Sequence, residues 1–206
     1  MNTTKNILEA AKRTILEESE SIANLVHYLT DDFAACVQLI MASNNRLVVT
    51  GIGKSAIIAQ KIVATLNSTG TPSLFLHAAE AVHGDLGMVQ KGDVIICISK
   101  SGNSPEIKVL VPLLKRFGNT LIGMTADKNS FLGKESHHIL HAFVEKEACP
   151  NNLAPTNSTT AQLVLGDALA VALMEARNFK SEDFALYHPG GALGKKLLLR
   201  VKDMLD

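Results

Sequence analysis

The stretch Val94 to Glu106, VIICISKSGNSPE, decides the fold of this chain. It begins with five apolar residues, mostly β-branched, and continues through a polar turn, Ser99 to Ser104, into a helix that Pro105 and Glu106 open. A short apolar run bounded by turn residues is typical of a strand that is buried on both faces of a parallel sheet. The stretch therefore predicts an α/β fold with a polar turn at the carboxyl end of a central strand.

This polar turn is a candidate ligand site. In open α/β sheets ligands bind at this edge, because the following helix directs free backbone N–H groups and its positive dipole end toward it. The turn offers three hydroxyls, one glycine and one amide, from Ser99, Ser101, Gly102, Asn103 and Ser104. These groups suit a phosphate dianion. The alternative is a purely structural turn, in which Ser104 caps the helix and Pro105 occupies its first position, and we expect this capping bond in either case.

The composition narrows the function classes. With 206 residues the chain is long enough for one sizeable core, and 47% hydrophobic residues with only 4% aromatics favour the aliphatic interior of a parallel α/β protein. Basic and acidic residues both number 20, so no broad positive field attracts nucleic acid or an anionic membrane, and a small molecule or a protein is the better partner.

Targeting signals and cysteine usage are informative as well. Three distant cysteines predict a reducing compartment. The charged N-terminus is unlike a signal peptide, and Asp167 interrupts the most apolar run, Leu163 to Met174, so we expect a cytoplasmic protein.

Outside the central stretch, strands and helices alternate from Arg46 onward. We expect strands at 47–50, 73–76, 94–98, 121–125 and 139–143, and helices at 55–68, 77–86, 105–117, 158–178 and 193–205. Right-handed crossovers between five short strands give a three-layer α/β/α sandwich with a five-stranded parallel sheet. Two helices, at about 4–29 and 31–43, precede this pattern, and helices in this position often pack on a neighbouring subunit. We expect one domain over 1–206, with the β-α core at about 46–201.

A second polar loop follows the first strand. Gly51 to Ala56, GIGKSA, matches the G-x-G-x-x-A pattern of dinucleotide-binding proteins. That pattern also requires an acidic residue near the end of the second strand, where this chain has His77, so we do not expect a dinucleotide. Val48 stands where a Walker A loop needs its first glycine. The loop is therefore interpreted as a tight glycine turn that presents Lys54 beside the neighbouring loop, Ser99 to Ser104.

Other candidate groups lie apart from these two loops. His77, His83 and Asp85 match no familiar metal spacing, so we expect no required metal, and at most adventitious binding at His83. For Glu145, after the fifth strand, a solvated turn is the favoured interpretation. His188 precedes a rigid Pro-Gly-Gly turn, which positions its side chain.

Five segments of the chain form a specific pattern when they are taken together and in order. They are GIGKS at 51–55, STGTPSLFLHAAEAVHGDLGMV at 68–89, ISKSGNSPEI at 98–107, KEACPNNLAPTNSTTAQLVLGDALAVAL at 146–173 and FALYHPGGALGKKLLLRV at 184–201. This pattern resembles the sugar isomerase (SIS) domain of D-arabinose-5-phosphate isomerases, which implies a SIS, flavodoxin-like fold. Many relatives continue into a pair of CBS domains. This chain ends at Asp206, where that pair would begin, so we expect a form without CBS domains.

The resemblance also implies an activity and a set of site residues. The family interconverts D-ribulose 5-phosphate and D-arabinose 5-phosphate for synthesis of the lipopolysaccharide sugar Kdo, without a cofactor. Carried over position by position, it implies four catalytic residues, Lys54, Glu106, Glu147 and His188. It implies substrate contacts from Ser55, His83, Ser99, Ser101, Gly102, Asn103 and Ser104. Similar proteins are tetramers with active sites between subunits, so we expect a homotetramer in which His83 or His188 acts on a neighbour's substrate.

The chemistry of the reaction suits these residue types. A carboxylate shielded from water can move the proton between the two carbons, and Glu106 is our first choice for this base, with Glu147 second. Lys54 is suited to neutralise the enediolate oxygen, and His188 to move protons between oxygens. One departure bears on substrate preference. Relatives often read S-N-S-G-E in the phosphate loop, where this chain has Lys100 and Asn103 in place of the Asn and the Glu.

Two other functions stay open at this point. One is a regulatory SIS module that binds a phosphosugar without turning it over, although the N-terminal helices lack the basic character of a DNA-binding segment. The other is an isomerase for a different sugar phosphate, such as sedoheptulose 7-phosphate or a hexulose phosphate, which the same phosphate loop would serve.

Overall fold

The computed structural model describes residues 3–191, so the helix expected at 193–205 lies outside the described residues. Five parallel strands form one sheet in the order β2-β1-β3-β4-β5. The strands are β1 Leu47–Gly51, β2 Ser73–His77, β3 Val94–Ile98, β4 Thr120–Thr125 and β5 His138–His141. This is the flavodoxin-like order, in which the winding direction reverses between β1 and β3. The predicted five-stranded parallel sheet is confirmed.

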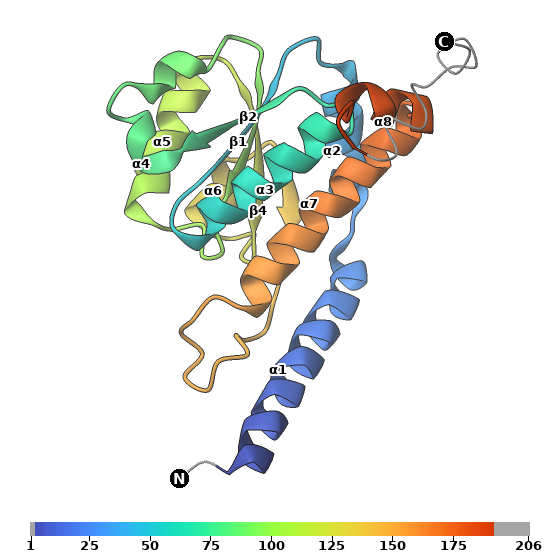
Figure 1. Cartoon of the computed structure of the whole chain (residues 1–206). Helices are drawn as coiled ribbons and strands as arrows, with labels where there is room; N and C mark the ends of the chain where they lie inside the picture. The colour runs from blue at the N-terminus through green and yellow to red at the C-terminus, as the bar shows by residue number, and fades with distance from the viewer. Residues whose placement is uncertain (1–2, 192–206) are drawn as a thin grey trace, which may run out of the picture.

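Helices cover both faces of the sheet (Figure 1). One face packs against α2 Asp31–Ala42, α3 Lys54–Ser68 and α7 Asn157–Ala176, and the other packs against α4 Ala78–Ala81, α5 Pro105–Arg116 and α6 Phe131–Glu135. Successive side chains of a strand point to opposite faces, so Val49 and Ile96 enter the first core, while Val48 and Ile95 enter the second. The molecule is therefore the three-layer α/β/α sandwich that the alternation predicts.

The long apolar helix α7 belongs to the core of this sandwich. By length and composition alone α7 could cross a membrane, as the only such helix among residues 3–191. Nine of its residues are buried, however, and it packs along α3. Gly166 allows this close approach, because a Cβ at this position would collide with Ile62. We therefore assign α7 to the interior of the domain.

Three local predictions need correction. The helix expected at 77–86 is only the short α4, followed by a turn and the 3-10 helix η2 Asp85–Met88, because Gly84 at φ 128° interrupts it. The short helices α6 and α8 Ser181–Tyr187 were not expected, since neither is long enough to give a helical period. The first helix ends earlier than expected, as α1 Thr4–Asn24 followed by the 3-10 helix η1 Leu25–Tyr28.

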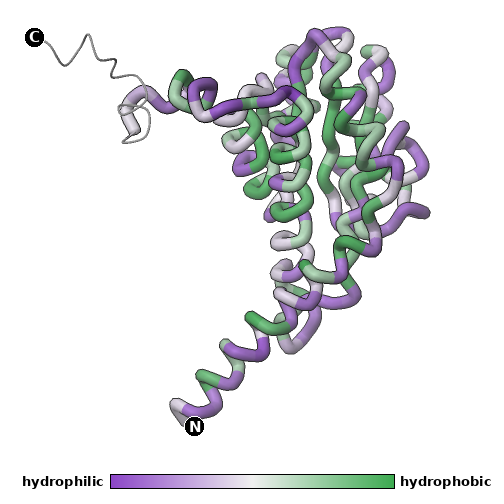
Figure 2. Tube along the Cα trace, turned by 90° about the vertical axis from the view of Figure 1, so that its right-hand side faces the viewer, coloured by the Kyte–Doolittle hydropathy of each residue, from purple (hydrophilic) through white to green (hydrophobic). Residues whose placement is uncertain are grey.

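Helix α1 projects away from the body of the domain, with the N-terminus at its far end (Figure 1). Its main contact is with α7, where the Asn157 amide donates a hydrogen bond to the Ser21 hydroxyl. No residue of α1 is buried, and apolar turns alternate with hydrophilic ones along it (Figure 2). Its large apolar side chains are 55–68% exposed at Ile7, Leu8, Ile15 and Leu16. The single chain thus leaves an apolar part of α1 in contact with solvent.

Candidate active site

The two polar loops lie side by side at the carboxyl edge of the sheet. Gly51 of β1 pairs with Ile98 of β3, and the loops leave these two residues in parallel. Lys54 is the first residue of α3 and is exposed. Gly53, just before it, has φ 59°, a conformation that favours glycine. The expected neighbourhood of Lys54 and the loop Ser99 to Ser104 is therefore confirmed.

The backbone of the Ser99 to Ser104 loop is anchored to the neighbouring strand and helix. The Lys100 carbonyl accepts hydrogen bonds from the backbone N–H of Ala126, at 3.0 Å, and from the Thr125 hydroxyl, at 3.1 Å. Gly102 has φ 64°, and a Cβ there would collide with the Ser130 side chain. The loop is thus held in shape by contacts that need no ligand.

The serines of this loop differ in what they bind. Ser99 Oγ accepts a hydrogen bond from the Gly102 backbone N–H at 3.1 Å, and Ser101 Oγ accepts one from Asn103 N–H at 3.3 Å. Ser104 stands before Pro105 at the start of α5, as expected, but the predicted capping bond of its side chain is wrong. Its Oγ is buried and has no partner among the described residues. This hydroxyl therefore has an unused capacity for one hydrogen bond.

Asn103, predicted to contact substrate, has a structural use in this chain. Its Oδ1 accepts a hydrogen bond from Phe131 N–H at 3.1 Å, and its amide nitrogen donates to the Ser101 carbonyl at 3.0 Å. The side chain thus joins the loop to the start of α6. Its role in substrate binding stays a prediction.

Glu147 is a buried carboxylate that accepts five hydrogen bonds. The donors are Lys100 Nζ at 2.6 Å, Ser158 Oγ at 2.5 Å, Thr156 N–H at 2.8 Å, Ser158 N–H at 3.1 Å and Thr156 Oγ1 at 3.2 Å. Burial by itself would raise the pKa of Glu147, but hydrogen bonds from Lys100, Ser158 and Thr156 outweigh it and lower the pKa to about 2. Glu147 is consequently ionised at neutral pH, and it is a weak base in the free protein.

The N-terminal turns of α7 connect two segments at the carboxyl edge of the sheet, the one after β5 and the one after β1. Ser158 binds Glu147, and one turn later the buried Gln162 accepts a hydrogen bond from Ser55 Oγ at 3.1 Å. These two α7 residues lie four apart on one helix face. Because Lys100 also binds Glu147, the loops after β1, β3 and β5 are tied together. The sequence offered no signal for this, since Lys100 and Glu147 are separated by 47 residues.

Glu106 lies in the first turn of α5, two residues after Ser104. It is half-buried, and within residues 3–191 it forms no ion pair. The structure thus brings Lys54, Ser104 and Glu106 to one edge of the sheet, as expected. Their catalytic and binding roles stay predictions.

His188 lies at the opposite edge of the sheet. Its ring stacks on Phe184 of α8, with centroids 3.8 Å apart, and Nδ1 contacts the Phe184 carbonyl at 2.9 Å. Arg177, between α7 and α8, donates to the Gly70 carbonyl just before β2 begins. A 20-residue helix is about 30 Å long, so α7 separates the segment that holds Glu147 before it from α8 and His188 after it by roughly that distance. Within one chain His188 cannot reach the candidate site.

His83 lies on an exposed turn after α4. Among the residues that the structure describes, no group of three or more His, Cys, Asp or Glu side chains is arranged to hold a metal ion. Within residues 3–191, therefore, His83 is not part of a cluster that could supply further metal ligands.

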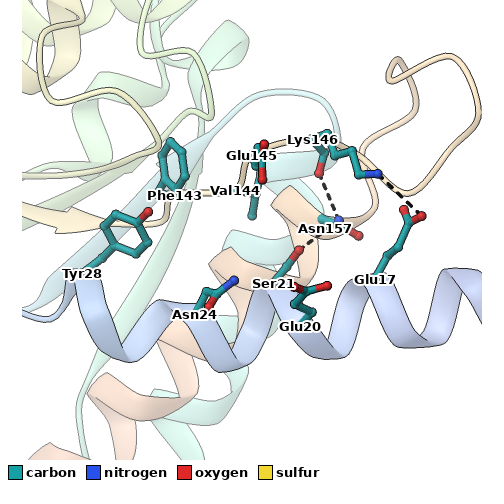
Figure 3. Close-up of a pocket in the computed structure, with 10 residues that line it drawn as sticks. All are labelled: Glu17, Glu20, Ser21, Asn24, Tyr28, Phe143, Val144, Glu145, Lys146 and Asn157. Carbon is teal, nitrogen blue, oxygen red and sulfur yellow. Dashed lines mark hydrogen bonds and ion pairs between the residues drawn. The ribbon is translucent and has the colours of Figure 1, made fainter.

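A cavity of about 310 Å³ lies between α1 and the segment after β5 (Figure 3). Glu145 and Lys146 line it, and Lys146 Nζ lies 3.7 Å from a Glu17 carboxylate oxygen of α1. None of the predicted catalytic or substrate-binding residues lines this cavity. Glu145 and Glu147 are two residues apart, but Glu145 lines this cavity whereas Glu147 contacts Lys100 and the start of α7.

The fold and the site together define a class of protein. A flavodoxin-like sheet that presents a lysine, a buried hydroxyl with no partner within residues 3–191 and a helix N-terminus at its topological switch point is an α/β domain suited to an anionic small molecule. The model of the SIS domain family matches residues 40–172. The chain belongs to this family.

Within this family, the chain is similar to proteins named arabinose 5-phosphate isomerase. The chain is 53% identical over 207 residues to the arabinose 5-phosphate isomerase KdsD of Pseudomonas aeruginosa, an alignment that covers 100% of this chain and 64% of that protein. It is 51% identical over 197 residues to KdsD of Escherichia coli K12, covering 96% of this chain and 60% of that protein. The chain therefore spans less than two thirds of the length of both curated relatives.

A solved structure is also similar. A protein of E. coli CFT073 in complex with arabinose 5-phosphate has a TM-score of 0.87 to this chain and is 42% identical to it. The match covers 92% of this chain and 100% of that chain.

Proposed function

We propose that this chain is an aldose-ketose isomerase that interconverts D-arabinose 5-phosphate and D-ribulose 5-phosphate. The observation that carries the proposal is the buried hydroxyl of Ser104, which has no described partner at the N-terminus of α5, beside the loop that presents Lys54. A phosphate would satisfy this hydroxyl and the free N–H groups of the helix. The relatives named arabinose 5-phosphate isomerase and the related structure with arabinose 5-phosphate support this choice of substrate.

The reaction assigns different tasks to the residues at this edge. Moving the carbonyl between C1 and C2 requires a base that takes a proton from one carbon and returns it to the other. Glu106 is the better base in the free protein, because the Glu147 carboxylate already accepts five hydrogen bonds. Lys54 stabilises the negative charge that develops on the enediolate oxygen. Phosphate binding orients the substrate between these groups.

A complete site needs a second copy of the chain in this proposal. His188 lies about 30 Å from Glu147 within one chain, and the exposed apolar side chains of α1 offer a surface for assembly. We therefore propose a homo-oligomer in which His188 of one subunit completes the site of another. The tetramer expected from the resemblance is one form of such an assembly.

The activity is tested by incubating the chain with a panel of five-, six- and seven-carbon sugar phosphates and measuring aldose-ketose conversion. We expect conversion of D-arabinose 5-phosphate, and we expect Ser104→Ala to raise KM roughly tenfold or more, because it removes a hydrogen bond to a charged phosphate. A panel on which the chain has no activity would refute the proposal. A Ser104→Ala variant with unchanged KM would remove Ser104 from the phosphate site.

The shared site is tested by mixing two inactive variants. Glu106→Gln and His188→Ala should each be inactive, whereas subunits exchanged between them should regain activity, because some sites then receive both intact residues. Co-expression of the two variants followed by an isomerase assay measures this. A mixture that stays as inactive as its components would contradict a site shared between subunits.

The other candidate function is a module that senses a phosphosugar. It would use the same phosphate loop without proton transfer. Incubation of D-arabinose 5-phosphate with the chain in D₂O discriminates between the two, since only an isomerase incorporates deuterium from solvent into the sugar.

A further inference from the structure

The contact between Lys100 and Glu147 joins the phosphate loop to the buried carboxylate. Lys100 Nζ lies 2.6 Å from Glu147 Oε1. The Lys100 side chain is 39% exposed, whereas that of Glu147 is 1% exposed. One partner of the pair is therefore accessible to a ligand, and the other is enclosed by protein.

The two partners also differ in how firmly they are held. The Lys100 backbone is fixed, because its carbonyl accepts from Ala126 and Thr125. The ammonium, in contrast, is on a flexible four-carbon stem, and within residues 3–191 Glu147 is the one carboxylate with which it forms an ion pair. Glu147 has four further donors from Thr156 and Ser158. When Lys100 leaves Glu147, these four hydrogen bonds stay in place.

A phosphate bound in the loop would compete with Glu147 for this ammonium. Lys100 stands between Ser99 and Ser101, inside the loop itself, so its flexible four-carbon side chain starts from the segment that would bind the anion. A phosphate monoester carries about −1.5 to −2 charge at pH 7, against −1 on the carboxylate. At comparable distance and exposure the phosphate attracts the ammonium more strongly.

We propose that Lys100 is a phosphate-responsive positioning residue, which holds Glu147 in the free protein and turns to the phosphate of the bound substrate, so that Glu147 keeps only its four donors from Thr156 and Ser158. This inference rests on the proposed function, because it assigns the phosphate to the loop. It gives Glu147 a second state that the free structure does not have. Lys100 acts through Glu147 and the phosphate, and it is not itself a proton donor to the sugar carbons.

The surroundings of Glu147 make its carboxyl resonance a usable readout. Two titratable groups face it in the described part of the chain, Lys100 from the loop after β3 and the Cys149 thiol on its own segment. Hydrogen bonds from the Ala154 and Leu153 N–H groups lower the pKa of Cys149, whereas the charge of Glu147 raises it. Lys146 faces α1 instead, where it lies near Glu17. A Lys146→Met variant is therefore a matched control for Lys100→Met.

The experiment follows the ¹³C-carboxyl resonance of Glu147 in the full chain at about pH 8, where phosphate carries about −2 charge, while inorganic phosphate is added. The resonance is identified by its loss in Glu147→Gln. We expect saturating phosphate to shift this resonance in the parent, because the carboxylate loses its contact with the Lys100 ammonium. Lys100→Met should have the shifted resonance without phosphate and show no further shift with it. Lys100→Arg and Lys146→Met should behave like the parent.

The outcomes separate this inference from the proposed function. If calorimetry detects phosphate binding and the parent's Glu147 resonance does not move, Lys100 has only a structural role, and the inference is wrong even if the chain is an active isomerase. If phosphate does not bind at all, the inference fails, and the phosphate loop of the proposed function fails with it. The parent titration needs no variant, so a misfolded Lys100→Met would not prevent either conclusion.

Discussion

The loop after β3 and the segment after β5 both end at the carboxyl edge of the sheet, but they use their polar groups differently. The first anchors its backbone and leaves Ser104 Oγ without a described partner. The second uses its carboxylate, Glu147, to accept hydrogen bonds from two residues at the start of α7 and from Lys100. A buried polar group without a partner needs an explanation, and at a helix N-terminus on this edge of the sheet an anionic ligand is one, whereas a saturated group is explained by the protein itself. Glu106 and Glu147, two carboxylates at the same edge, therefore differ in what they can do.

The contrast between Glu106 and Glu147 is tested by substituting each of them. We expect the largest effect, on the catalytic rate, from Glu106→Gln. Removing the base should lower kcat/KM for D-arabinose 5-phosphate by about 10²- to 10⁴-fold, since that is the usual contribution of general-base catalysis. The midpoint of thermal unfolding should stay close to that of the parent, because Glu106 forms no ion pair within residues 3–191. Steady-state kinetics and a thermal melt of the same preparation measure both. Parent-like kinetics would show that Glu106 is not the base.

Glu147→Ala, in contrast to Glu106→Gln, should lower the stability of the fold. It leaves the N–H groups of Thr156 and Ser158 and the Lys100 ammonium without their acceptor, so we expect the free energy of unfolding to fall by about 3–5 kcal/mol. Urea unfolding followed by circular dichroism measures this. Glu145→Ala is the matched control and should change stability little. Equal effects of the two substitutions would mean that the segment after β5 is not organised by Glu147.

Acid should reproduce part of the Glu147→Ala effect in the parent. The pKa of Glu147 is about 2 in the folded chain against an ordinary value of 4.5, so its contribution to stability is complete above about pH 4.5 and is lost as the pH falls toward 2. We expect at most about 3 kcal/mol of lost stability from this group. Urea unfolding at several pH values, compared with Glu147→Gln, isolates it. If the difference between the two proteins stays constant over this range, the carboxylate is not titrating as described.

Much of the fold follows from patterns within a few residues. The apolar run Val94 to Ile98 and the glycine and serine turns around it predict a parallel sheet, and the observed strand order places the Lys54 loop beside the Ser99 to Ser104 loop. The short helices α6 and α8 were not predicted, because elements of five and seven residues carry too little periodicity. The Ser104 capping bond was predicted from local preference, and the structure replaces it with a buried hydroxyl that has no described partner.

The sequence by itself determined the five-stranded parallel sheet, the family and the residues at the carboxyl edge, because hydrophobic period, turn chemistry and motif spacing are all local properties. Only the tertiary structure decided that Glu147 is saturated by Lys100 and by the start of α7, and that His188 lies at the far end of that helix. Both facts depend on which distant segments meet. Spacing along the chain does not encode such meetings, whereas burial and hydrogen-bond satisfaction in the folded protein do.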